Sequence, residues 1–188
     1  MQLRHVASQL EASARQYRLM FNEHPHPMWV YESGSLRLLA VNRAMLSQYG
    51  YTEAEALQLN LLDLWPASER EKVRTAVQAT ASKSRHVPAL CQQLRKEGSL
   101  FDAEVTAGSI SFNGVAARQV LAVDVTERLR AEREIARMAR AQKLLSACNE
   151  TLVRATSESA LLQAICQIAV DIGGYRMGWV GFAHNDEH

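Results

Sequence analysis

The sequence has little of what marks a secreted, membrane-spanning or nucleic-acid-binding protein. Only three of its 188 residues are cysteines (Cys91, Cys148 and Cys166), so a disulfide framework is not expected and a reducing cytoplasm fits best. No apolar run is long enough to span a bilayer, and the N-terminus lacks the apolar core of a signal peptide. The 21 basic and 20 acidic residues nearly cancel, which gives no electrostatic reason to expect nucleic acid or an anionic membrane as a partner.

The sequence motifs of common enzymes are also missing. There is no P-loop, no Gly-x-Gly-x-x-Gly fingerprint and no Gly-x-Ser-x-Gly elbow, and none of the six histidines lies in a recognisable phospho-acceptor helix. His24 and His26 flank a proline, and His184 and His188 lie at the chain end, but neither pair has a companion ligand set. We therefore predict no metal site and no catalytic activity in this chain.

Hydrophobic residues make up 47% of the chain, which is enough for a packed core in one ordinary domain and part of another. Residues 1–21 have apolar side chains at spacings of three and four, a pattern that predicts an amphipathic helix ending before Pro25 and Pro27. This helix either packs on its own domain or pairs with a second copy. The apolar positions are Leu3, Val6, Leu10, Tyr17 and Met20.

Residues 28–41 read as a hairpin, with a strand over Met28–Glu32, a turn, and a strand over Leu36–Val41. Short helices follow. Asn42–Tyr51 suits one, a capping box from Thr52 to Glu55 opens another, and Ser68 with Glu71 signals a longer helix ending near residue 81. The mostly apolar segment 59–65 between these helices is expected to face the core.

Three further strands are predicted after these helices, over Val87–Leu94, from Phe101 onward, and over Val115–Val125. Asn113-Gly114 is typical of a type I′ hairpin turn. The alternation of apolar and polar residues reverses at Gly108, which predicts a bulge or bend there. The order of elements favours an α+β fold, a five-stranded antiparallel sheet with short helices on one face, flanked by N-terminal and C-terminal helices.

The run from Val120 into Glu127 predicts a buried strand that leads directly into a helix, with Asp124 and Glu127 forming a capping box. Residues 128–156 carry a heptad stripe, which favours a parallel homodimeric coiled coil, although a helix docked on its own chain remains an alternative. Polar residues in the stripe would weaken the pairing but fix its register. The seam candidates are Ile135, Met138, Gln142, Leu145, Asn149 and Leu152.

Four segments together resemble the PAS family. They are Pro27-Met-Trp-Val-Tyr31, Ala40-Val-Asn-Arg-Ala44 with Tyr49-Gly-Tyr-Thr-Glu53, Arg95-Lys-Glu-Gly-Ser99, and Asp124-Val-Thr-Glu-Arg128. The resemblance covers roughly residues 16–128, within an expected domain over 22–127. It implies a sheet that senses a small ligand, a cofactor or a partner and regulates an attached effector.

The resemblance also implies roles for individual residues. Asp124, Thr126 and Glu127 would form the signal-transfer junction, with a plain helix cap as the alternative for Asp124. Haem and a photoactive flavin are not expected, because the predicted helix before the third strand has no histidine, His86 follows it, and the flavin-binding Asn-Cys-Arg motif is absent. The cofactor therefore stays unknown. Candidates to line an interior pocket, or simply to fill the core, are Trp29, Tyr31, Asn42, Trp65 and Phe101.

Residues 145–188 are similar to the opening of a GAF domain. Ser157 is expected to cap a helix, Gly173-Gly174 to end it, and Tyr175–Phe182 to form an apolar strand. Such a domain needs well over a hundred residues and the similar segment spans only 145–188, so we expect the domain to be cut after its first strand, leaving that strand unpaired.

These patterns lead to one main hypothesis and two alternatives. The main one is a cytoplasmic PAS sensor from a multidomain bacterial signalling protein, whose output domain is a histidine kinase or a cyclic-di-GMP enzyme of the diguanylate cyclase or phosphodiesterase type. The alternatives are a dimerisation module without a ligand, and an autonomous enzyme. In the main hypothesis the partners are a second copy of the chain, a small molecule and a downstream output domain.

Overall fold

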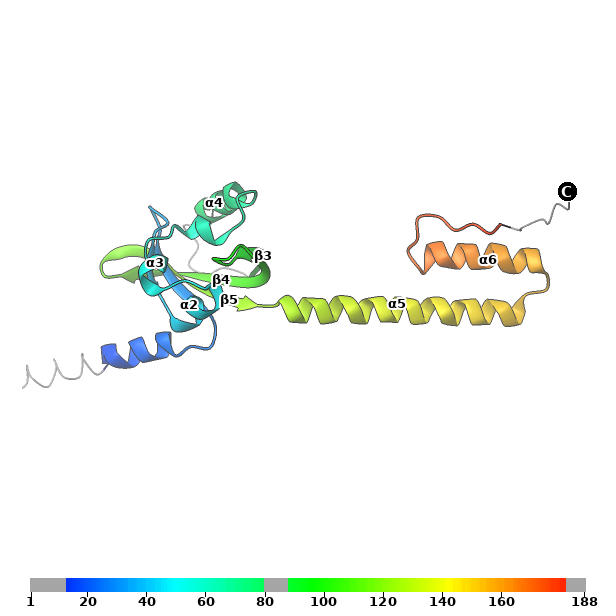
Figure 1. Cartoon of the computed structure of the whole chain (residues 1–188), viewed down its shortest axis with the longest axis horizontal. Coiled ribbons are helices and arrows are strands. Elements are labelled where there is room, and N and C mark those ends of the chain that lie inside the picture. Colours follow the sequence, from blue (N-terminus) through cyan, green and yellow to red (C-terminus); the bar gives the residue numbers. More distant parts are fainter. Residues whose placement is uncertain (1–12, 80–87, 182–188) are drawn as a thin grey trace, which may run out of the picture. The chain divides into compact units, whose positions relative to one another are not determined.

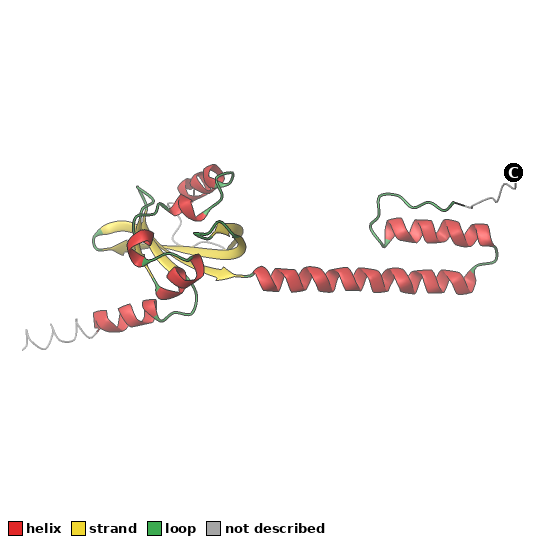
Figure 2. Cartoon of the chain, in the orientation of Figure 1, coloured by secondary structure: helices red, strands yellow, loops and turns green. Residues whose placement is uncertain are grey.

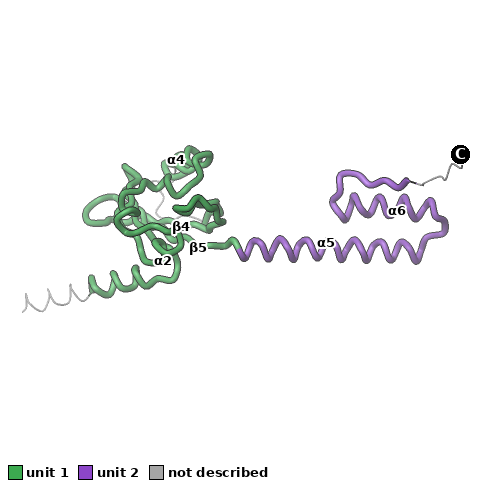
Figure 3. Tube along the Cα trace, viewed as in Figure 1, with its two compact units in different colours: residues 1–126 green, residues 127–188 purple. Residues whose placement is uncertain are grey.

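The computed structural model describes residues 13–79 and 88–181. It divides into two compact units, Met1–Thr126 and Glu127–His188, which Figure 3 colours green and purple. The predictions that involve residues 1–12, His86, His184 and His188 lie outside the described residues.

The first unit contains a five-stranded antiparallel sheet with the strand order β2-β1-β5-β4-β3 (Figures 1 and 2). The predicted α+β class and the number of strands are confirmed. The first strand has the predicted bounds, and the Asn113-Gly114 turn has positive φ at both residues, as a type I′ turn requires. The strands are β1 (Met28–Glu32), β2 (Leu38–Val41), β3 (Ala89–Leu94), β4 (Leu100–Phe112) and β5 (Val115–Asp124).

Four short helices connect β2 to β3, and side-chain caps define where three of them begin. Asn42 caps the first, Thr52 and Glu55 form the predicted capping box of the second, and Asn60 with Asp63 forms a further box that the sequence reading did not identify. Gly50, at φ 79°, ends the first helix in the left-handed conformation that glycine adopts without strain. The helices are α2 (Arg43–Tyr49), α3 (Glu53–Ala56), η1 (Leu61–Leu64) and α4 (Arg70–Ala79).

The core lies between one face of the sheet and these helices. At its centre the Tyr49 ring stands edge-on to the rings of Trp29, at 5.8 Å, and Phe101, at 5.3 Å. The segment 59–65 faces this core as predicted, since Leu61, Leu62, Leu64 and Trp65 are buried. The α4 helix differs from the others because none of its residues is fully buried, and only Val73 and Val77 pack against the core.

The bulge predicted at Gly108 is wrong. The β4–β5 pairing runs without a shift from Ala103 opposite Asp124 to Phe112 opposite Val115. The reversal of the apolar pattern has another cause: beyond Gly108 the residues in line with the core, Ser109 and Ser111, are exposed. The sheet does contain an irregularity, but it lies in the first hairpin, where Val30 pairs with Ala40 and Tyr31 pairs with Leu38.

The second unit consists of α5 (Thr126–Arg154) and α6 (Glu158–Asp171). Ser157 caps α6 through its hydroxyl, and Gly174 follows the helix at φ 72°, both as predicted. The strand predicted from Tyr175 is wrong over the described residues 175–181, because an isolated strand has no neighbour to accept and donate its backbone hydrogen bonds. Within the described part of the chain, no helix is both long and apolar enough to cross a membrane.

Candidate ligand cavity and helix junction

A cavity of about 380 Å³ lies between α4 and the sheet. Ligand pockets typically have volumes of roughly 300–1,000 Å³, so this one suits a small molecule. One wall is formed by α4, and the others come from η1, the residue after it, and four strands. The lining residues are Tyr31, Leu61, Trp65, Lys72, Val73, Ala76, Val77, Ala89, Cys91, Val105, Ala107, Arg118 and Val120.

The polar groups of this cavity are few and mostly buried. Tyr31 and Arg118 are direct cross-strand partners on β1 and β5, and each is 2% exposed. Burial raises the pKa of the Tyr31 hydroxyl, an effect that the nearby Arg118 charge partly offsets, so Tyr31 stays a hydrogen-bond donor at neutral pH. Burial likewise raises the pKa of the Cys91 thiol to about 11, which makes a reactive thiolate unavailable there.

The structure places two of the five predicted pocket residues, Tyr31 and Trp65, at this cavity. Trp29 and Phe101 instead pack around Tyr49 in the core. Asn42 caps α2 by accepting from the Met45 backbone N–H at 2.9 Å, and its other contacts are also to backbone groups. These three residues therefore support the fold rather than line the cavity.

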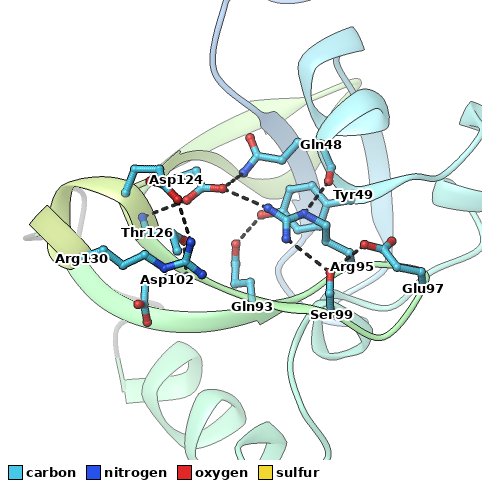
Figure 4. Close-up of polar contacts among 11 residues, drawn as sticks. Gln48, Tyr49, Gln93, Arg95, Glu97, Ser99, Asp102, Asp124, Thr126 and Arg130 are labelled. Atoms are coloured by element: carbon cyan, nitrogen blue, oxygen red, sulfur yellow. Dashed lines mark hydrogen bonds and ion pairs between the residues drawn. The ribbon is translucent and has the colours of Figure 1, made fainter.

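A second polar cluster forms where β5 ends and α5 begins (Figure 4). The Asp124 carboxylate accepts hydrogen bonds from Arg95 Nη2 at 3.0 Å, from Gln48 Nε2 at 3.1 Å, and from the Thr126 backbone N–H at 3.0 Å. The Thr126 hydroxyl oxygen accepts from the backbone N–H of Asp102 at 3.0 Å. We call Gln48, Arg95, Asp102, Asp124 and Thr126 the junction cluster. The cluster joins α2, β4, the end of β5, the turn that follows β3, and the start of α5.

The predicted capping box between Asp124 and Glu127 is wrong. Asp124 is the last residue of β5, and α5 begins at Thr126, so Asp124 lies one residue too early to act as the N-cap. Glu127 pairs instead with Arg130 at 2.8 Å, and its side chain is 86% exposed. Of the three residues predicted for signal transfer, the structure thus brings together Asp124 and Thr126 and leaves Glu127 outside the cluster.

Arg95 connects the junction cluster to the core. Its guanidinium lies 4.3 Å from the centre of the Phe101 ring, and its Nε donates to the Gln48 carbonyl at 3.0 Å. Behind it, the buried Tyr49 hydroxyl donates to the side-chain oxygen of Gln93. Burial holds the pKa of Tyr49 well above its usual range, which keeps this donor protonated.

Two candidate residues were not predicted, although the alternation of inward and outward positions along their strands indicates them. In β5, Arg118 alternates with Val120 and Ala122, so a cation occupies a position that faces the core. In β3, Gln93 has the same inward parity and is fully buried. A charged or amide side chain at an inward position of a strand is a signal for a polar site. Lys72 and Val73 on α4 had no comparable signal.

Comparison with known proteins decides the family. A sequence model described as the PAS fold matches residues 15–123, which is more than half of the chain. The chain belongs to the PAS family. PAS domains are sensory modules of signalling proteins rather than catalytic ones, so the coarse functional prediction is confirmed.

Individual relatives are distant. The methyl sulfide methyltransferase-associated sensor of Methanosarcina acetivorans is 26% identical over 186 residues, and the match covers 94% of this PAS chain but only 17% of that protein. Among solved structures, the PAS domain of an HTR-like protein from Haloarcula marismortui has a TM-score of 0.57 at 19% identity, covering 64% of this chain and 98% of that domain. A LOV protein from Rhodobacter sphaeroides has a TM-score of 0.55 at 13% identity, covering 87% and 94%. These structures share the fold.

Proposed function

We propose that this chain is a ligand-sensing PAS module that relays occupancy of the cavity under α4 to the α5 helix. One observation carries the proposal: the neighbouring strands β4 and β5 each contribute to both the cavity and the junction cluster, and the turn after β3, a third strand of the cavity, carries Arg95. On β5, Val120 lines the cavity and Asp124 lies in the cluster. On β4, Val105 lines the cavity and Asp102 holds Thr126, while β3 carries Cys91 and leads to Arg95.

A displacement of the sheet at the cavity would therefore reach the start of α5 over a few residues of continuous strand. Strands in a hydrogen-bonded sheet cannot shift singly without breaking their ladder, so a ligand that moves β5 also moves β4. The ion pair between Arg95 and Asp124 and the hydrogen bond to the Thr126 hydroxyl would then either hold or release the first turn of α5. A ligand shifts this equilibrium only by the difference between its affinities for the two states.

Within a longer signalling protein, α5 would connect the PAS domain to an output domain of the histidine kinase or cyclic-di-GMP type. The relative from Methanosarcina acetivorans, named as a sensor and much longer than this chain, is consistent with such an arrangement. Residues 145–188 would then begin a GAF domain. We propose a cytoplasmic location, which the three free cysteines Cys91, Cys148 and Cys166 support.

A homodimer is the second part of the proposal. The apolar seam candidates on α5 are exposed, at 66% for Ile135, 60% for Met138, 63% for Leu145 and 59% for Leu152. Within the second unit α6 runs beside the end of α5 (Figure 1), and the half-buried residues there lie on another face, at Leu144, Ala147 and Cys148. The exposed apolar stripe of α5 also favours the alternative function, a dimerisation module that binds no ligand, because pairing two copies would cover the stripe without any ligand.

Native mass spectrometry separates the two functions. We expect the purified protein to carry a non-covalent small molecule, and we expect the variant Val73→Trp, which fills the cavity, to lack it. The matched control is Val153→Trp, because Val153 is 86% exposed on α5. If wild type and Val73→Trp have the same mass apart from the substitution, the ligand-free alternative is favoured.

Hydrogen exchange tests the relay. Loaded wild-type protein and the Val73→Trp variant should differ in amide exchange over residues 126–130, because the first turn of α5 depends on the junction cluster. Residues 158–171 of α6 serve as an internal reference, for which no difference is expected. Equal exchange in the first turn of α5 would contradict the relay even if a ligand is found.

A further inference from the structure

The walls of the cavity carry charge of one sign only. Among the described lining residues, Lys72 and Arg118 are cationic and none is acidic. Lys72 lies at the protein surface, where its Nζ pairs with Glu69 at 2.9 Å and its side chain is 75% exposed. Arg118 is 2% exposed, so the buried charge of the cavity is that of Arg118.

The other polar groups at the cavity are hydrogen-bond donors. The Tyr31 hydroxyl lies across the strand pair from Arg118 and is protonated. The indole nitrogen of Trp65 is buried near the Cys91 thiol, and within the described residues it has no oxygen acceptor. A donor whose neighbour is a weakly accepting thiol gains from a ligand oxygen that only accepts, because oxygen is the stronger hydrogen-bond acceptor.

The remaining walls are apolar and come from both α4 and the sheet. Val73, Val77, Val105, Ala107 and Val120 present methyl groups to the cavity. A small inorganic anion would leave these surfaces uncovered, whereas an organic anion would cover them with its own apolar body. Guanidinium groups bind carboxylates through two parallel hydrogen bonds, which suits Arg118 to that headgroup better than a lysine would.

We propose that the cavity binds a small organic carboxylate, with the carboxylate against Arg118 and Tyr31 and the apolar part between α4 and the sheet. This inference rests on the proposed function, because it names the ligand class of the same sensing site. It assigns Arg118 the role of specificity residue and Tyr31 that of a second donor. It also predicts that the apolar part of the ligand, rather than the headgroup, contacts α4.

Matched probes test the charge requirement on wild-type protein. Benzoate, hexanoate and 3-methylbutanoate are compared with benzamide, hexanamide and 3-methylbutanamide by thermal shift and calorimetry at fixed ionic strength. At least one carboxylate is expected to bind saturably, at least tenfold more tightly than its amide. Inorganic phosphate, a control for non-specific anion effects, is expected to give no saturable shift. The Val73→Trp variant should lose binding of the carboxylate.

Substitutions at Arg118 then locate the headgroup. Arg118→Gln should weaken carboxylate binding at least tenfold, Arg118→Lys should restore part of it, and Arg43→Gln should have no effect, because Arg43 is a surface residue paired with Glu23. If Arg118→Gln does not fold by circular dichroism, the comparison of acids with amides and the loss in Val73→Trp decide the matter.

The results distinguish this inference from the proposed function. Amides that bind as tightly as the acids would overturn the carboxylate assignment while leaving a ligand-sensing cavity in place. Phosphate binding as tight as that of the carboxylates would overturn the role of the apolar walls. If none of the three carboxylates binds, the inference is overturned. The sensing function is then tested separately by whether wild type carries a bound small molecule that Val73→Trp lacks.

Discussion

The two units of this chain differ in what covers their apolar side chains. Every buried apolar residue of the described chain lies between Pro27 and Val125, whereas α5 and α6 contain no buried residue at all. The PAS unit encloses its own core, and its fold is specified by contacts within it. The second unit carries comparable apolar side chains, which are exposed along the stripe of α5 and half-buried on α6.

This difference shows which kind of sequence signal is sufficient for each unit. Alternation and caps in residues 28–125 select one sheet, because only one register buries the core face. The heptad stripe of α5 specifies a helix and a face, but nothing within the described residues of the second unit covers that face. The four predictions below test this contrast, from the largest expected effect to the smallest.

Two tryptophans give the strongest test of the contrast. Trp29 is fully buried in the PAS core and Trp179 is 79% exposed in the second unit. Trp29→Ala should lower the free energy of unfolding of the PAS unit by about 3–5 kcal/mol, since it removes a large side chain and leaves a cavity. Trp179→Ala should lower it by less than about 0.5 kcal/mol. Urea unfolding followed by the fluorescence of Trp65 measures both, and equal effects would contradict the division into units.

The same contrast explains how far the sequence predicts the structure. Strands that face the core on one side, such as β1, and helices with side-chain caps, such as α3, were predicted well because local pattern and burial agree. The strand from Tyr175 failed because a strand requires a neighbour that local sequence cannot supply. At Gly108 the change in pattern was real, but it marked the point beyond which the core-side residues Ser109 and Ser111 are exposed, and not a bulge.

The candidate site was predictable only in part, for a related reason. Asp124 and Thr126 were named because residues 124–128 resemble a PAS segment, and a motif of contiguous residues is a local signal. Arg118 and Arg95 act through partners distant in sequence, Tyr31 on β1 and Asp124 on β5. Long-range pairings of this kind depend on the register of the sheet, which a single sequence does not display.

Replacing the polar residues of the α5 stripe by leucine tests whether the exposed face of the second unit is a dimer seam. The double variant Gln142→Leu, Asn149→Leu should tighten dimerisation at least tenfold, about 1.4 kcal/mol, because polar residues in a coiled-coil seam weaken pairing. The matched control is Lys143→Leu, Glu150→Leu, which has the same spacing but lies off the seam. Sedimentation equilibrium gives the dissociation constants, and an unchanged constant in the first variant would contradict the seam.

The junction cluster lies at the boundary of the two units and should respond more weakly. Asp124→Asn removes the ion pair between Asp124 and Arg95. The side chains of Asp124 and Arg95 are 31% and 25% exposed, so the free energy of unfolding should fall by about 1 kcal/mol. It should also speed amide exchange at Thr126. Glu127→Gln, at the first residue of the second unit, should change neither quantity, because the ion pair of Glu127 is with Arg130 on its own helix. Equal stability and equal amide exchange at Thr126 in the two variants would contradict a role for Asp124 in holding the start of α5.

The surface ion pair between Lys96 and Glu55 in the PAS unit should have the smallest effect on stability. This effect is detected through its dependence on pH. Lys96 and the backbone N–H of Thr52 bond the Glu55 carboxylate and lower its pKa from 4.5 to about 2. Because the folded-state pKa is depressed, this pair stabilises the fold above pH 4.5, and its contribution is lost as the pH falls toward 2.

The matching experiment compares wild type with Glu55→Gln between pH 2 and pH 6, by thermal unfolding followed through Trp65. The difference in Tm should be present near pH 6 and vanish as the pH approaches 2. Glu150→Gln on α5 removes a carboxylate paired with Arg154 in the second unit, so it should leave this profile unchanged. A constant difference across the range would mean that Glu55 contributes through packing or helix capping and not through its charge.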